Sequence, residues 1–105
     1  VEALELQHYA LLTLPAMEGL AAAAQARWPL DGLLIIHRAG IMHPGDPIVL
    51  VAAAARHRRD AFAAAEFAMD HLKSESWFWK REQANGLWRW IEPREQDFAD
   101  IKRWE

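Results

Sequence analysis

The basic residues of this sequence are most concentrated at Arg56-His57-Arg58-Arg59, between an apolar run and a helix-forming segment. Free backbone N–H groups and the helix dipole favour an anion at the start of a helix, and Arg or His side chains add charge-assisted hydrogen bonds to phosphate. The cluster therefore predicts a phosphate site. The alternative is a solvated basic turn, in which cations at the start of a helix are mildly unfavourable.

Two lysines, Lys73 and Lys80, stand on either side of an expected chain reversal near residues 74–76, which could bring both amines toward one cleft. Neighbouring ammonium groups lower each other's pKa, and a neutral amine can attack a carbonyl carbon. The pair therefore indicates a reactive amine. The spacing alone does not require one, because surface lysines are common.

Sulfur and metal chemistry have little support in the composition. The chain has no cysteine, which excludes disulfides, thiolate metal sites and cysteine nucleophiles, so any sulfur handled here must arrive on a partner. The histidines show no helical pair at ligand spacing, and no metal site is expected. They are His8, His37, His43, His57 and His71.

Length and charge limit the class of protein. A chain of 105 residues has room for one domain, and its 52% hydrophobic and 26% charged residues are typical of a folded globular protein. The net charge of −3, from 12 basic and 15 acidic residues, argues against nucleic acid or an anionic membrane as partner. No apolar run approaches the roughly 20 residues of a membrane span, so a cytoplasmic protein is expected.

The first part of the chain combines strand and helix patterns. Apolar and polar residues alternate over 4–9, which predicts a strand. Apolar residues then recur at helical spacing up to Trp28, with Thr13 as the expected N-cap and Pro15 in the first turn. The short β-branched run over 32–39, bounded by glycine, favours a buried strand.

The middle of the chain continues the alternation. Turn residues over 43–47 separate the run at 32–39 from an apolar run at 48–54, which together predict strand, turn and strand. Apolar residues at helical spacing, together with several alanines, predict a helix over 59–73.

A hairpin rich in tryptophan is expected near the C-terminus. Asn85-Gly86 predicts a tight turn, and Trp77, Trp79, Trp88 and Trp90 alternate on the flanking strands as an aromatic ladder. Core packing or a subunit interface is favoured over base stacking for this ladder. A domain this small cannot bury six tryptophans without leaving an apolar patch, which predicts a homodimer through sheet and hairpin surfaces. A polar tail is expected after Pro93.

These elements predict one α+β domain over residues 1–105, with a mixed or antiparallel sheet, two main helices and a C-terminal hairpin. The motifs, taken in order, resemble the large-subunit family of molybdopterin synthase across nearly the whole chain. The matching segments are LELQHY at 4–9, RWPL at 27–30, IHR at 36–38 with Gly40, PGD at 44–46, HR at 57–58, AF at 61–62, MD at 69–70, LK at 72–73, FWKRE at 78–82, Trp90 and RE at 94–95. Single pieces are weak, but the ordered set, ending in Trp-Lys-Arg-Glu, is specific.

The resemblance implies an α/β hammerhead-like fold and a homodimer that binds a small ubiquitin-like subunit at each end, as a heterotetramer. The C-terminal Gly-Gly tail of that subunit, carried as a thiocarboxylate, is then expected to donate sulfur to cyclic pyranopterin monophosphate. Two such transfers form the dithiolene of molybdopterin, and no cofactor of the enzyme is implied. This expectation fits the absence of cysteine.

The resemblance also assigns residues by position. It implies two catalytic lysines, Lys73 and Lys80, and four substrate-binding residues: His57, Arg58, Met69 and Arg94. We expect Lys73 to polarise or transiently attack a carbonyl-type centre, and Lys80 to stabilise developing negative charge.

The sequence departs from the family pattern at its start, where the family has a first strand and a loop containing glycine and arginine. Two alternatives therefore stay open. One is a non-catalytic scaffold that keeps the fold and binds the small subunit. The other is a small nucleic-acid-binding domain that uses residues 56–59 and the tryptophan ladder, against which the acidic net charge argues.

Overall fold

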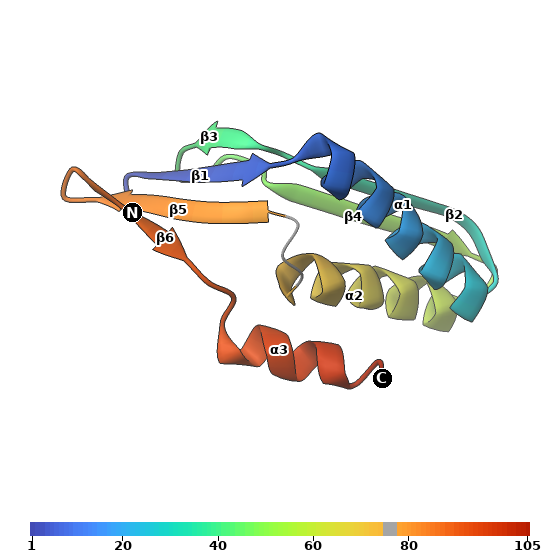
Figure 1. Cartoon of the computed structure of the whole chain (residues 1–105). Coiled ribbons are helices and arrows are strands. Elements are labelled where there is room, and N and C mark those ends of the chain that lie inside the picture. The colour runs from blue at the N-terminus through green and yellow to red at the C-terminus, as the bar shows by residue number, and fades with distance from the viewer. Residues whose placement is uncertain (75–77) are drawn as a thin grey trace.

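Two antiparallel sheets and three helices make up the described part of the chain, residues 1–74 and 78–105, in a computed structural model (Figure 1). In chain order the elements are β1 (Ala3–His8), α1 (Ala10–Arg27), β2 (Leu30–His37), β3 (Gly40–Met42), β4 (Val49–Ala55), α2 (Arg58–Ser74), β5 (Phe78–Ala84), β6 (Leu87–Ile91) and α3 (Glu95–Lys102). The α+β class, the two main helices and the hairpin are confirmed.

The two sheets lie along an elongated molecule of 48 × 27 × 23 Å. One sheet has four strands in the order β3-β1-β5-β6, and the other is the two-stranded ribbon β2–β4. Figure 1 shows α1 and α2 running beside the ribbon, while the four-stranded sheet occupies the opposite end from the N-terminus of α2. The strand β3 was not predicted. It is short and pairs with β1 from Leu4↔Met42 to Leu6↔Gly40.

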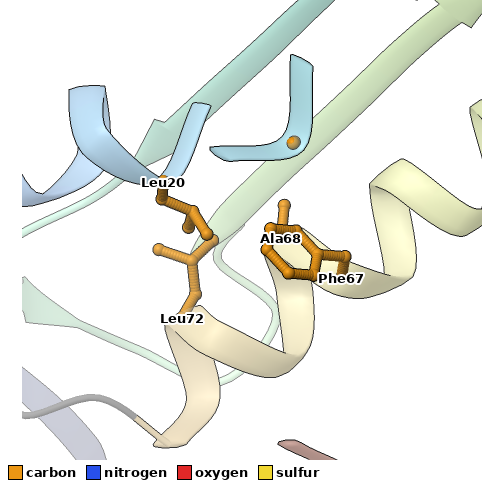
Figure 2. Packing of buried hydrophobic residues seen from close by; sticks show 5 residues of the cluster. Leu20, Phe67, Ala68 and Leu72 are labelled. Atoms are coloured by element: carbon orange, nitrogen blue, oxygen red, sulfur yellow. The ribbon is translucent and has the colours of Figure 1, made fainter. Parts of the chain in front are cut away.

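The hydrophobic core forms between α1, α2 and one face of the ribbon. Leu20 of α1 points toward Phe67, Ala68 and Leu72 of α2 (Figure 2). Because strand side chains alternate between faces, Leu33, Ile35, Val49 and Val51 share the face of β2–β4 that packs on this cluster. The core thus holds α2 against α1 and the ribbon.

The start of α1 differs from the prediction. The helix begins at Ala10 after an N-cap at Tyr9, so Thr13 is not the cap and Pro15 lies beyond the first turn. The N–H of Thr13 already donates to the carbonyl of Tyr9 at 2.8 Å, and the Thr13 side chain is buried. The physical reason is that β1 leads directly into the helix, which leaves no residues for a separate loop before Thr13.

A polar tail was predicted after Pro93, and the structure adds that this segment forms a helix, α3, with no fully buried residue. The N–H of Arg94 donates to the carboxylate of Asp97 at 2.9 Å, which caps the start of this helix. At its other end, the indole N–H of Trp104 and the guanidinium of Arg103 donate to Asp70 on α2, at 2.6 and 2.7 Å. These contacts fasten α3 to α2 beside the core.

The predicted hairpin is confirmed by its turn and its register. Asn85 and Gly86 have φ values of 54° and 77°, the left-handed geometry that favours Asn-Gly in a two-residue turn. The pairs Arg81↔Trp90 and Gln83↔Trp88 then place Trp88 and Trp90 on the same sheet face as Trp79. Trp77 lies outside the described residues.

Candidate active site

An open cavity of about 390 Å³ lies where the end of α2, the hairpin β5–β6 and the segment leading into α3 meet. Its walls are mainly aromatic and apolar, and Lys80 contributes an ammonium group. The residues lining it are Ser74, Phe78, Trp79, Lys80, Trp90, Ile91, Glu92, Pro93 and Phe98. Such a setting excludes much of the water from around a charged group.

Lys80 lies on β5, which is hydrogen-bonded to β1 on one side and to β6 on the other. It pairs with Leu6 of β1 and with Ile91 of β6, so its side chain leaves the sheet on the face that carries these two apolar residues. Burial lowers the pKa of Lys80, and charge repulsion from Lys73 lowers it further. Lys73 is therefore near enough for its charge to act on Lys80, although Lys73 is not among the described residues that line the cavity.

Two other predicted site residues lie near the lysines. Arg94, at the N-cap of α3, lies close enough to lower the pKa of Lys80, whereas the carboxylate of Asp97 raises it. Met69 is half-buried and precedes Lys73 by one helical turn, which puts both residues on the same side of α2. Asp97 was not predicted, and its helix-capping position is the sequence signal that could have identified it.

His57 and Arg58 do not join this site within one chain. They lie at the N-terminus of α2, and Lys73 follows Arg58 by 15 positions, which is about 22 Å along a helix axis. Both side chains are exposed and line an open hollow of about 630 Å³ formed by residues 56–60. The carbonyl of His57 accepts hydrogen bonds from Asp60 and Ala61, as expected at a helix start.

His37, at the end of β2, is a site residue that the functional assignment missed. Its ring stacks on Phe78 at 3.9 Å between centroids, with 19° between the planes. Burial lowers the pKa of His37, and repulsion by Lys73, Lys80 and His8 lowers it further, which outweighs a hydrogen bond to the Arg38 carbonyl. The sequence held one signal, the Ile-His-Arg segment at 36–38.

Two groups of exposed apolar side chains lie on the sheets, and the second group, with Trp79 and Trp90, also borders the cavity. On the outer face of the ribbon, Leu34, Ile36 and Leu50 are each about half exposed, and Ile36 pairs directly with Leu50. On the four-stranded sheet, Trp79 and Trp90 are exposed beside Arg81, whose guanidinium lies 5.7 Å from the Trp90 ring centroid. Neighbouring exposed apolar side chains of this kind are typical of surfaces that bind other molecules.

Residues 1–74 and 78–105 show neither a membrane span nor a metal-binding group of side chains. None of the helices there has the length and hydrophobicity that a membrane span requires. No three His, Asp or Glu side chains in that part of the chain are grouped so that they could hold a metal ion.

Comparison with known proteins gives a consistent family match. A family model described as "MoaE protein" matches residues 1–75. The chain is 47% identical over 104 residues to the molybdopterin synthase catalytic subunit of Cereibacter sphaeroides, and 50% identical over 105 residues to that of Brucella melitensis. These alignments cover 99% and 98% of the chain, but 71% and 64% of the relatives' own lengths.

Solved structures show the same similarity. The molybdopterin biosynthesis MoaE protein from Burkholderia ambifaria superposes with a TM-score of 0.81 at 48% identity, covering 97% of this chain and 71% of that one. Molybdopterin synthase from Staphylococcus aureus gives a TM-score of 0.80 at 29% identity, covering 86% of this chain and 66% of that one. The chain thus spans roughly two thirds of the proteins it resembles.

Proposed function

The chain belongs to the MoaE protein family, and from this premise we propose that it is the catalytic subunit of a cytoplasmic molybdopterin synthase. It transfers sulfur from the thiocarboxylated C-terminus of a small ubiquitin-like subunit to cyclic pyranopterin monophosphate. The product carries the dithiolene of molybdopterin. The observation that supports this function best is the cavity in which Lys80, with Lys73 nearby, is partly withdrawn from water.

The lysines supply two kinds of catalysis in this proposal. A neutral lysine amine can add to a carbonyl-type centre, and a charged one can stabilise negative charge on an oxygen or sulfur. We assign the first role to Lys73 and the second to Lys80, with Arg94 adding positive charge beside the substrate and Met69 bordering the pocket. The low polarity around Lys80 strengthens each of these interactions relative to water.

The sulfur donor enters on a partner, because the chain contains no cysteine to carry it. A Gly-Gly tail has no side chains, so an extended C-terminus of that kind can enter the open cavity of about 390 Å³ and reach Lys80. Aromatic walls such as Phe78 and Trp90 favour close backbone packing and exclude water from the reacting carbonyl. The small ubiquitin-like subunit is thus bound by its tail.

The predicted phosphate ligands require a second copy of the chain. The outer face of the ribbon, with Leu34, Ile36 and Leu50, supports a twofold interface. In this interface the outer faces of two β2–β4 ribbons pack against each other with their strands running in opposite directions. Residues 56–59, which follow β4 in one copy, then approach the end of β2 in the other copy. The cavity with Lys80 adjoins that end of β2. His57 and Arg58 of one copy then bind the substrate phosphate beside Lys73 of the other. With one small subunit per cavity, the assembly is a heterotetramer.

The test of this function is direct. We expect the purified chain, mixed with a thiocarboxylated small subunit and cyclic pyranopterin monophosphate, to form dithiolene, measured by iodine oxidation to the fluorescent pterin derivative. A small subunit with an ordinary carboxylate is the matched control and yields no product. A chain that binds the thiocarboxylated subunit tightly but forms no dithiolene is a scaffold, and the enzyme assignment is then wrong.

The shared site makes a prediction about mixed dimers. Arg58→Ala and His57→Ala each remove a charge-assisted donor and are expected to weaken substrate binding about 10- to 100-fold, or roughly 1.5–3 kcal/mol. At a substrate concentration too low for the Arg58→Ala dimer to bind, Arg58→Ala and Lys73→Ala chains are unfolded and refolded together in equal amounts. The mixture is expected to regain about a quarter of wild-type activity, because half of the dimers then hold one intact site. No regain at all contradicts a site that draws Lys73 and Arg58 from different copies.

A further inference from the structure

The imidazole of His37 lies at the junction between the two sheets, on the side of the molecule that carries the lysine cavity. It is the last residue of β2, and its ring stacks on Phe78, the first residue of β5 and part of the cavity wall. Phe78 and Lys80 are two residues apart on β5, so their side chains share a sheet face. His37 is therefore positioned against the same wall as Lys80.

The tautomer of His37 follows from its backbone partner. Nδ1 of the ring lies 2.8 Å from the carbonyl oxygen of Arg38. A carbonyl oxygen can only accept, so Nδ1 carries the hydrogen and donates it. In the neutral ring Nε2 is then left with a free lone pair, which is the form of histidine that takes up a proton.

The surroundings of His37 keep this lone pair available at neutral pH. The groups that act on its pKa are Lys73 of α2, Lys80 of β5, His8 of β1 and the carbonyl of Arg38. Burial and the three basic side chains lower the pKa of the imidazole below its usual value of about 6.5, despite the opposing effect of the carbonyl. His37 is thus a neutral base near enough to Lys73 and Lys80 for their charges to act on it.

We propose that His37 is the general base of the lysine pair, and this proposal rests on the function proposed above. When a neutral lysine nitrogen adds to a substrate carbonyl carbon, a C–N bond forms and the carbonyl electron pair moves to oxygen. The nitrogen then holds one proton too many, which passes to Nε2 of His37 directly or through one water. His37 gives that proton to the alkoxide oxygen, which forms a carbinolamine. The second proton of the nitrogen then passes through Nε2 to the hydroxyl, so the C–O bond breaks, water leaves and an imine of the lysine is formed.

The role can be measured first without any substrate. Histidine NMR is expected to show His37 titrating below 6.5, with Nδ1 protonated in the neutral form. Lys73→Met and Lys80→Met each remove a positive charge and should therefore shift this titration to higher pH. A His37 that titrates normally and ignores both substitutions overturns the proposal.

The second measurement is the pH dependence of sulfur transfer. We expect His37→Phe, which keeps an aromatic ring on Phe78, to lower kcat about 100-fold with little change in KM, and to lose the acidic limb of the kcat profile. His37→Asn, which keeps a donor for the Arg38 carbonyl but no base, should behave in the same way. The acidic limb of the unsubstituted chain falls below 6.5, because activity is lost as His37 gains a proton.

His71 provides a matched control on α2. It also bonds a backbone carbonyl through Nδ1, that of Phe67 at 2.8 Å, and its ring lies against an aromatic ring at 4.2 Å. His71→Phe is expected to keep both the rate and the pH profile. If the unsubstituted chain forms product and His37→Phe matches it at every pH, the role of His37 is wrong and the proposed function stands. If the unsubstituted chain forms no product, both fall.

Discussion

Replacing Lys73 with alanine is expected to abolish sulfur transfer, with a loss of more than about 100-fold in kcat, while fold and partner affinity change little. The side chain is only half-buried in the last turn of α2, so its removal costs little packing. Its charge, however, acts on both Lys80 and His37. The substitution thus removes the proposed nucleophile, and it also removes the positive charge that lowers the pKa of Lys80 and of His37.

The measurement is the single-turnover rate of dithiolene formation, with partner binding followed by calorimetry on the same preparation. Lys102→Ala is the matched control, because Lys102 is an exposed lysine in the last turn of α3. Its rate should equal that of the unsubstituted chain. Activity of Lys73→Ala within about threefold of wild type, less than ~0.7 kcal/mol in barrier, removes Lys73 from the mechanism.

The elements that the sequence predicted well are those whose local signals agree with their packing. The helix expected over 59–73 is observed as Arg58–Ser74, because its apolar face, its alanines and its charged ends favour the same structure. The tight hairpin follows from Asn85 and Gly86, which adopt the required left-handed backbone at small cost. The family resemblance is confirmed by the family model and by relatives of 45–50% identity.

The errors occurred where local signals conflicted with tertiary contacts. Thr13 has the residue type of an N-cap, but a helix that follows β1 directly places it in the second turn and buries it. The C-terminal segment was predicted as a polar tail without a helix because of its charges. Its acidic first turn and basic last turn in fact suit a helix, and Trp104 anchors it on α2.

The candidate site was only partly predictable for a geometric reason. Lys73 and Lys80 are seven residues apart in sequence, at the end of α2 and on β5, and the charge of Lys73 acts on Lys80. His37 is far from both lysines in sequence. It lies near them because its strand, β2, and the strand β5 of the other sheet come together where His37 stacks on Phe78, and the hydrophobic periodicity of a sequence does not predict how two sheets pack. Residues 75–77 of the expected reversal lie outside the described part of the chain.

Phe67→Ala is expected to lower the free energy of unfolding by about 3–5 kcal/mol, the largest stability effect that we predict for one substitution. Phe67 is 3% exposed and joins three parts of the chain, because Trp28 after α1 and Trp104 after α3 both contact its ring edge-to-face, at 5.3 and 5.5 Å. The guanidinium of Arg27 covers the same ring at 4.9 Å. Removing the ring leaves a cavity that these large, mutually packed side chains cannot fill by small shifts.

Urea denaturation followed by circular dichroism measures this loss, and Phe62→Ala is its control. Phe62 lies on the same helix but is 67% exposed, so its removal should change stability by less than about 0.5 kcal/mol. Phe67 precedes Lys73 by six residues, about 9 Å along α2, and does not line the cavity. Folded Phe67→Ala chains at low temperature should therefore keep the rate of sulfur transfer. If fully folded Phe67→Ala chains lose activity, the aromatic cluster also sets the position of the last turn of α2. If the free energy of unfolding falls by less than about 1 kcal/mol, the packing described for the core is contradicted.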